Sequence, residues 1–269
     1  MDDRGKWRLN FKVFALEDEL TFVIGPQINS FRGTLIFTNS MVVVGGTDDV
    51  ITNGGFGLVD TGQKKLLVTC HHVWKGFLQE REQNPKARMC VCLHGRSPVA
   101  FDKCEPIGQD ATLDIATFDI SPVLGACGEH KFFPLNQNPA PHVAKGDRLV
   151  LLGDQGVFRS LTDTGLEFGV TTYLVHVSSV DGLRFQASIS NMESKYVRRP
   201  VRVPKSSPHG GISGSPCFLI REDRPCQLVG FVTGDWMNYL FFVHASCLNS
   251  DGTIKKAPTG DACQPIETN

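Results

Sequence analysis

The sequence is short of the features that mark membrane, nucleic-acid-binding and helical proteins. Among its 269 residues, no apolar run approaches the ~20 residues that a membrane-spanning helix needs. Its 27 basic and 28 acidic side chains leave a formal net charge of −1, so we expect no overall attraction to nucleic acid or to a membrane surface. Helical periodicity is weak and no internal repeat is evident, which argues against helical bundles and solenoids.

Disulfide pairing and secretion are also poorly supported. The chain has nine cysteines, an odd number, and they are dispersed along it. Its first residues, MDDRGKWR, lack the apolar stretch of a secretory signal. We therefore expect reduced thiols and a cytoplasmic, intracellular location. Dispersed cysteines do not form a metal-ligand motif, so neither a metal site nor a cofactor is predicted.

What the sequence does contain is a series of short β-type segments. Runs of β-branched and aromatic residues alternate with turns rich in Gly, Asn and Asp. Many short strands at close spacing favour a barrel or sandwich. The expected strands are Thr34–Phe37, Met41–Val44, Phe56–Asp60, Lys65–Thr69, Met89–Leu93, Asp114–Ile120, Arg148–Leu152, Val170–Ser178, Leu183–Ser188, Gln227–Thr233 and Tyr239–His244. The clearest helical candidate is a short turn at His72–Gln79.

Two loop-like segments stand out from this pattern. The turn-rich stretch Ser121–Gly146 contains four prolines and divides the strands into two groups, so it is interpreted as a connection between two β units. Five basic side chains lie within Lys195–Lys205. This cluster is either a solvated surface loop or a loop beside a substrate cleft that meets an acidic substrate or partner.

The segment Gly210–Pro216 (GGISGSP) carries the strongest local motif. Glycines on both sides of Ser213 permit a tight turn that exposes the hydroxyl. They also let backbone N–H groups converge on one point, where such donors stabilise the oxyanion of an acyl-transfer intermediate. A serine hydroxyl is a weak nucleophile and needs an adjacent base. Taken alone, the motif is equally compatible with a Gly/Ser-rich loop that has no chemistry.

Two other segments offer a base and a carboxylate. An apolar run leads into the adjacent His71 and His72, and a histidine at a strand end can exchange a proton near neutral pH. Asp114 lies between apolar residues, where a carboxylate needs a hydrogen-bonding partner. A histidine N–H would be such a partner and would fix the imidazole tautomer. Asp110 and Asp119 are the local rivals of Asp114.

Together these motifs resemble those of trypsin-like (chymotrypsin-fold) serine peptidases, nearest to the stand-alone bacterial type. The family's Thr-Ala-x-His motif is similar to the segment beginning at Thr69, with Cys70 in place of alanine. Its Asp-Ile-Ala motif is matched by Asp114–Ala116, and its Gly-x-Ser-Gly-x-Pro motif by Gly211–Pro216. The resemblance extends over about Thr34–Leu248.

This resemblance implies a fold of two packed antiparallel six-stranded β-barrels with few short helices. It implies an N-terminal extension (1–33), a protease domain (34–248, with barrels at about 34–125 and 146–248) and a C-terminal tail (249–269). The implied function is a serine endopeptidase acting through an acyl-enzyme. In that mechanism Ser213 is the nucleophile, His72 the base and Asp114 the residue that orients the base, and the N–H groups of Gly211 and Ser213 form the oxyanion hole.

The family alignment also indicates a substrate pocket. Ser207 would lie near its floor, and Thr233, Gly234 and Asp235 would lie along one wall. A serine floor favours an uncharged substrate side chain, whereas Asp235 would favour a basic one. The expected partners are a polypeptide substrate and a protein regulator that binds the N-terminal segment or the basic loop, with neither nucleic acid nor membrane.

One departure from the family bears on activation. Secreted members complete the oxyanion hole when a new N-terminus pairs with an aspartate just before the nucleophile. Ile212 occupies that position and cannot form an ion pair, so we expect no activation step of that kind. The alternative functions are a catalytically silent pseudo-protease that binds peptides or partners, a cysteine protease using Cys217, and a non-enzymatic barrel that binds a metal or nucleic acid.

Overall fold

The computed structural model describes residues 28–38, 52–93, 99–101, 103–123, 125, 130–162, 165–189, 210–221, 224–236 and 238–255. This part of the chain is dominated by strands. The first group of elements is β1 (Arg32–Thr38), β2 (Thr52–Asp60), β3 (Lys65–Thr69), α2 (His71–Gln83), β4 (Arg88–Cys92), β5 (Val99–Ala100), β6 (Pro106–Asp110), β7 (Ile115–Asp119), the 3₁₀ turn η1 (Ser121–Val123) and β8 (Phe133–Pro134). The second group is β9 (Arg148–Thr162), β10 (Gly165–Asp181), β11 (Arg184–Ser188), β12 (Pro216–Arg221), β13 (Arg224–Trp236), β14 (Tyr239–His244) and the 3₁₀ turn η2 (Ala245–Cys247).

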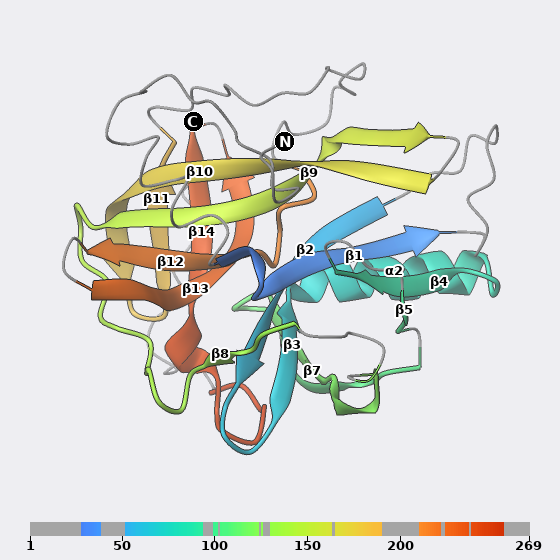
Figure 1. Ribbon diagram of the computed structural model, residues 1–269, viewed down its shortest axis with the longest axis horizontal. Coiled ribbons are helices and arrows are strands. Elements are labelled where there is room, and N and C mark those ends of the chain that lie inside the picture. The colour runs from blue at the N-terminus through green and yellow to red at the C-terminus, as the bar shows by residue number, and fades with distance from the viewer. Residues whose placement is uncertain are drawn as a thin grey trace, which may run out of the picture.

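The two groups form two separate β units. Strands β1 to β8 make an eight-stranded sheet with the order β5-β4-β1-β2-β3-β7-β6, and β8 pairs in parallel with β2. Strands β9 to β14 close into a six-stranded barrel in the order β10-β11-β14-β13-β12-β9. Figure 1 shows the barrel on the left and the sheet with α2 on the right. The predicted all-β fold is confirmed, although in the described residues the first unit is a curled sheet and only the second closes fully.

Several sequence predictions change in detail. The predicted helix His72–Gln79 is longer and spans His71–Gln83. The stretch Ser121–Gly146 is not purely a connection, because it contains β8, which pairs with β2. The predicted strand Met41–Val44 and the basic cluster Lys195–Lys205 lie outside the described residues.

The middle of the sheet is buried on both faces, which explains its continuous apolar runs. In β3, successive side chains point to opposite faces. Leu66 and Val68 enter the core shared with the barrel, while Leu67 enters a second core under α2. The shared core also contains Phe218 and Phe231 from the barrel. Strand β3 therefore lies between two apolar layers, and its C-terminal end lies at the boundary between sheet and barrel.

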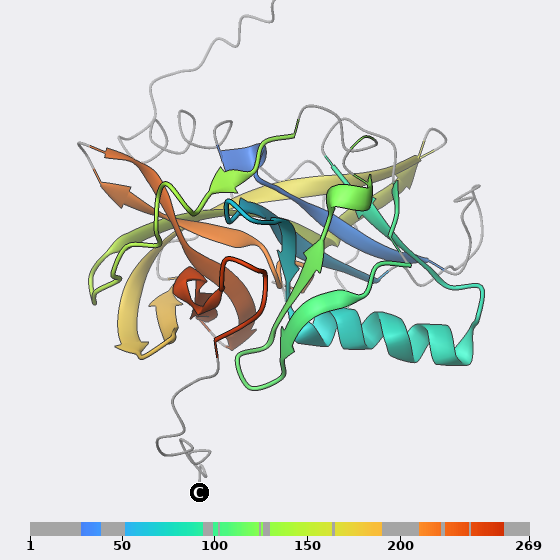
Figure 2. The same ribbon diagram turned by 90° about the horizontal axis from the view of Figure 1, so that it is seen from below.

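Helix α2 begins directly after β3 and covers the second core. Its buried side chains, Val73, Trp74 and Phe77, have the spacing of one helical face. The Trp74 ring lies edge-on to Phe118 of β7, with ring centroids 5.1 Å apart. Figure 2 shows the helix running along the outer side of the sheet. With 13 residues, this longest helix of the described chain is too short to cross a bilayer.

A buried ion pair, which we call the charged junction, joins the sheet to the barrel. The Arg32 guanidinium of β1 donates two hydrogen bonds to the Asp154 carboxylate of β9, at 2.8 and 3.0 Å. The Thr34 hydroxyl donates to the same carboxylate, and the Asn53 amide donates to the Asp154 backbone carbonyl at 3.0 Å. The Arg32 and Asp154 side chains are only 4% and 9% exposed. Such a buried charge is tolerated because its partner and hydrogen bonds are all in place.

Candidate active site

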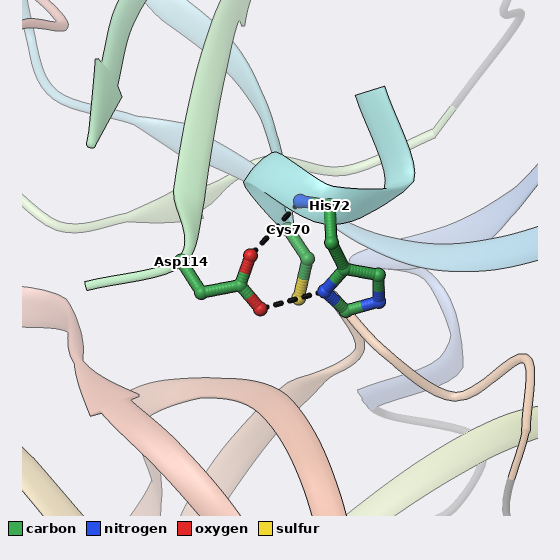
Figure 3. Close-up of side chains that lie close together, drawn as sticks. All are labelled: Cys70, His72 and Asp114. Carbon is green, nitrogen blue, oxygen red and sulfur yellow. Dashed lines mark hydrogen bonds and ion pairs between the residues drawn. The ribbon is translucent and has the colours of Figure 1, made fainter. Parts of the chain in front are cut away.

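His72 and Asp114 meet at the boundary between sheet and barrel. His72 Nδ1 lies 2.6 Å from Asp114 Oδ2, and the His72 backbone N–H donates to Asp114 Oδ1 at 2.9 Å (Figure 3). The His72 side chain is 51% exposed and that of Asp114 is 24% exposed. The imidazole is therefore held on its Nδ1 side by the carboxylate while the ring remains accessible to solvent.

The first turn of α2 explains why the carboxylate binds there. The N-terminal N–H groups of a helix have no partners within the helix, and the helix dipole favours a negative charge beside them. The N-cap residue Cys70 makes no side-chain capping bond, and the first turn contains no acidic residue. Asp114, from the turn between β6 and β7, accepts the His72 N–H instead. The same carboxylate thus caps the helix and orients the imidazole.

The turn that carries Asp114 is held in an uncommon conformation. Asp114 has a φ of +54°, in the left-handed region that Asp and Asn enter more readily than most residues. Within the same turn, the Asp110 carboxylate accepts the Leu113 N–H at 2.8 Å. Asp119, the other sequence rival, pairs with Lys64 at 2.8 Å. Both rivals therefore have other partners, and of these three aspartates Asp114 is the one that contacts a histidine.

Cys70 lies directly beneath this pair. Its side chain is 1% exposed, and its Sγ lies 3.0 Å from the Val232 carbonyl oxygen of β13. Burial, followed by the negative charge of Asp114 and a hydrogen bond to that carboxylate, raises the pKa of the Cys70 thiol well above its usual value. The thiol is therefore protonated in this environment and contacts both the carboxylate and the barrel. In the sequence, Cys70 stands out only as a replacement for alanine in the family motif, because its neighbours in space come from β13 and the β6–β7 turn.

The Ser213 loop is held against the sheet by backbone contacts, which we call the site junction. The Gly55 N–H donates to the Ser213 carbonyl at 2.7 Å, and the Gly214 N–H donates to the Val232 carbonyl at 2.7 Å. Gly214 has a φ of +92°, and a Cβ there would lie 2.2 Å from the Gly55 carbonyl oxygen. Only glycine permits this approach. The Val232 carbonyl therefore contacts both the Ser213 loop and the thiol of Cys70.

The predicted oxyanion residues lie in the same loop. Gly211 has a φ of +99°, and its carbonyl accepts a 3.4 Å hydrogen bond from the Asn53 amide. Ile212 is 1% exposed and packs in the barrel core. The residue before Ser213 therefore anchors the loop by apolar packing. No local signal in the sequence marks this role of Asn53, because its partners lie more than 100 residues away in the chain.

The structure brings together His72 and Asp114 and seats the Ser213 loop beside them through Gly55 and Val232. Within the described residues, no hydrogen bond joins His72 to Ser213. Catalytic hydrogen bonds of this kind often tighten only when substrate binds. The alternative nucleophile, Cys217, is fully buried in β12, and burial raises its pKa well above the usual value. Its side chain packs in the barrel core, where a substrate cannot reach the sulfur.

The structure describes three of the four predicted pocket residues. Ser207 lies outside the described residues. Thr233, Gly234 and Asp235 lie on β13, beyond Val232, and all three are partly exposed. A Cβ placed on Gly234 would meet no atom within 4 Å. This edge of β13 therefore borders open space beside the site junction.

Three side chains around His72 could together hold a metal ion. Cys70 Sγ, His72 Nδ1 and an Asp114 carboxylate oxygen all lie within 4.8 Å of one another. Thiolate, imidazole and carboxylate are the three ligand types that zinc takes in proteins.

No protein-family model matches the sequence, and no curated protein matches it. Solved structures with a similar shape include one from a study of how aromatic interactions drive the coupled folding and binding of the intrinsically disordered Sesbania mosaic virus VPg protein. It is 16% identical, with a TM-score of 0.44, over 79% of this chain and 85% of that chain. The crystal structure of Deg5 is 13% identical, with a TM-score of 0.48, over 84% of this chain and 90% of that chain. These similarities concern the β fold alone, and the chemistry of the site depends on its own contacts.

Proposed function

We propose that this chain is a serine endopeptidase that cleaves peptide bonds through an acyl-enzyme. The observation that carries the proposal is the pair of contacts from Asp114 to His72, one to Nδ1 and one to the backbone N–H. With the Nδ1 proton directed at the carboxylate, the neutral imidazole has its lone pair on Nε2. That atom is free to accept a proton from a nucleophile.

Ser213 is the proposed nucleophile. Its hydroxyl attacks the scissile carbonyl as its proton passes to His72 Nε2, and the imidazolium is stabilised by Asp114. The N–H groups of Gly211 and Ser213 stabilise the oxyanion, a role supported by the positive φ of Gly211 and by the hydrogen bond that holds the Ser213 carbonyl. His72 then protonates the leaving amine, and water hydrolyses the acyl-enzyme.

Covalent labelling with a fluorophosphonate probe tests this proposal, because the reaction needs an activated hydroxyl. We expect labelling of the wild-type protein, with mass spectrometry placing the probe on Ser213, and no labelling of Ser213→Ala. Ser215→Ala is the matched control. The Ser215 hydroxyl is buried and has no hydrogen-bond partner among the described residues, so its loss should leave the loop intact.

The alternative is a pseudo-protease that binds peptides without cutting them. It is favoured by the lack of a His72–Ser213 hydrogen bond in the described residues. Failure of the folded wild-type protein to label would support this alternative.

If the protein is active, a substrate library that varies the residue before the scissile bond tests the specificity of its pocket. We propose an uncharged preference, and a strict preference for Arg or Lys would instead implicate Asp235.

A further inference from the structure

We propose that Cys70, His72 and Asp114 form a binding site for a thiophilic divalent cation of the Zn²⁺ type, and that the bound ion blocks the base of the proposed peptidase. The site itself follows from the geometry, and only its inhibitory effect rests on the proposed function. The sequence predicts no metal site, because its cysteines are dispersed. The three ligands come together only through the contact between the β6–β7 turn and the start of α2.

The positions of the three donor atoms are close to those that zinc needs. In a tetrahedral site with Zn–N and Zn–O distances near 2.1 Å and a Zn–S distance near 2.3 Å, ligand atoms lie roughly 3.3–3.6 Å apart. Here the three donor atoms lie within 4.8 Å of one another, with Nδ1 and Oδ2 separated by 2.6 Å. Reaching zinc geometry requires Nδ1 and Oδ2 to separate by under about 1 Å, and requires any donor pair at the 4.8 Å limit to approach by about 1.2 Å. The His72 ring is half exposed, so it has room for that movement.

The surroundings of the carboxylate suit a metal ligand. Asp114 Oδ1 is held by the His72 backbone N–H at 2.9 Å, which leaves Oδ2 as the ligand atom. Hydrogen bonds of this kind orient metal-binding carboxylates and are part of most metal sites. In the view of Figure 3, the Cys70 sulfur overlaps the hydrogen bond that joins Asp114 Oδ2 to His72 Nδ1, and the three donor atoms lie within 4.8 Å of one another. A bound ion would have three protein ligands, and water would complete its coordination on the side of the half-exposed His72 ring, because Cys70 is buried.

Metal binding balances in both charge and protons. The ion displaces the Cys70 thiol proton, which passes to solvent. The His72 proton leaves Nδ1 and is replaced by one on Nε2, so the imidazole stays neutral. One Zn²⁺ is taken up and one proton is released. The thiolate and the Asp114 carboxylate then neutralise the two positive charges of the ion, so the net charge of the site changes from −1 when it is empty to zero when the ion is bound.

The same proton movement explains why binding would inhibit. With the ion on Nδ1, the proton of the neutral imidazole lies on Nε2. His72 then has no lone pair to accept the proton of Ser213. Alanine, which the trypsin-like family carries at the position of Cys70, removes the thiolate and leaves the histidine and the aspartate. Cys70→Ala should therefore lose the metal site while keeping the proposed catalytic residues.

Titration of the full-length, reduced protein with Co²⁺ tests the site without any measurement of activity. A thiolate bound to Co²⁺ gives a charge-transfer band in the near ultraviolet. We expect this band in the wild-type protein, its displacement by Zn²⁺, and at least a tenfold weaker affinity, about the loss seen when metal sites are altered, for Cys70→Ala. The matched control is Cys226→Ala, which removes a partly exposed thiol elsewhere on β13 and should keep the band.

Two results would overturn the metal site: a wild-type protein with no thiolate band, or a band that survives in folded Cys70→Ala. If Cys70→Ala does not fold, Cys70→Ser retains a small hydrogen-bonding side chain and provides the same comparison. The inhibitory effect is tested by fluorophosphonate labelling of Ser213. Zn²⁺ should slow labelling of the wild type, EDTA should restore it, and labelling of Cys70→Ala should not respond to Zn²⁺.

The two proposals fail in different ways. A wild-type protein that is folded, metal-free and unlabelled contradicts the proposed peptidase, but its Co²⁺ band still supports the metal site. A wild-type protein that labels at Ser213 equally with and without saturating Zn²⁺ contradicts the inhibitory effect.

Discussion

The two junctions that join the sheet to the barrel are built from different chemical groups. The charged junction relies on long side chains, because Arg32 reaches from β1 to Asp154 of β9. The site junction relies on backbone atoms brought close together by glycine, as in the contact between Gly55 and the Ser213 carbonyl. A junction made by long side chains stabilises the contact between two units whose backbones lie apart. A backbone junction fixes the position of a loop, as a nucleophile and an oxyanion hole require.

The largest expected effect is on chemistry and falls on the site junction. Asp114→Asn should reduce the rate of fluorophosphonate labelling or peptide hydrolysis by roughly 10⁴-fold, because the amide no longer favours the correct imidazole tautomer. Stability should change little, since Asn tolerates the φ of +54° at this position. Labelling rates and chemical denaturation curves measure the two effects. A rate near that of the wild type would show that Asp114 does not orient the base.

The next largest effect is on stability and falls on the charged junction. Arg32→Met should lower the free energy of unfolding by about 3–5 kcal/mol, because the buried Asp154 carboxylate loses its partner. The double variant Arg32→Met with Asp154→Leu should recover much of this loss, since no unpaired charge remains. Urea denaturation of the two variants and the wild type makes the comparison. Equal stabilities for the single and double variants would show that the ion pair is not the source of the effect.

The close approach of backbones at the site junction predicts a smaller loss of stability. Gly214→Ala should lower the free energy of unfolding by roughly 2–3 kcal/mol, because it combines a positive φ with a collision against a carbonyl oxygen. Gly234→Ala is the matched control for stability, since its added Cβ meets no neighbour. Denaturation midpoints test this pair of variants. If both variants unfold at the same midpoint, the loop is less tightly seated than the contact implies.

The smallest expected effect comes from a third contact, between the barrel and the segment before β9. His244 Nε2 lies 2.9 Å from the Pro141 carbonyl, and its Nδ1 lies 2.7 Å from the Ser246 hydroxyl. Burial lowers the pKa of His244, and the nearby His142 and Lys255 act in the same direction, against a hydrogen bond to Pro141 that raises it.

Because the folded-state pKa of His244 lies below that of the unfolded chain, the unfolded chain binds more protons at pH values between the two. The contribution of His244 to the free energy of unfolding is complete above its unfolded-state pKa of about 6.5. This contribution is lost as the pH falls through the folded-state pKa. Denaturation at several pH values should show this decline, and His244→Gln should make it shallower. An unchanged decline in His244→Gln would assign the effect to other groups.

Much of the fold follows from local sequence patterns. Short β-branched runs and turn residues predict an all-β chain, and the continuous apolar run of β3 reflects burial on both faces. The helix after the histidines was predicted too short, because its buried Val73, Trp74 and Phe77 precede a polar second half that gives weak periodicity. The closure of one sheet and the curling of the other depend on long-range pairing, which local patterns do not specify.

For the candidate site, the sequence by itself determined a loop with converging glycines around Ser213 and a short set of histidines and aspartates. Only the tertiary structure decided among them. His72 contacts Asp114 because the β6–β7 turn meets the N-terminal end of α2, while Asp110 and Asp119 accept hydrogen bonds from other groups. The tertiary structure also placed the thiol of Cys70 beside Asp114 and the amide of Asn53 beside the Ser213 loop. The physical reason is that hydrogen bonds and metal-ligand geometry depend on distances in space, and residues 42 or more positions apart acquire those distances only when the strands pair.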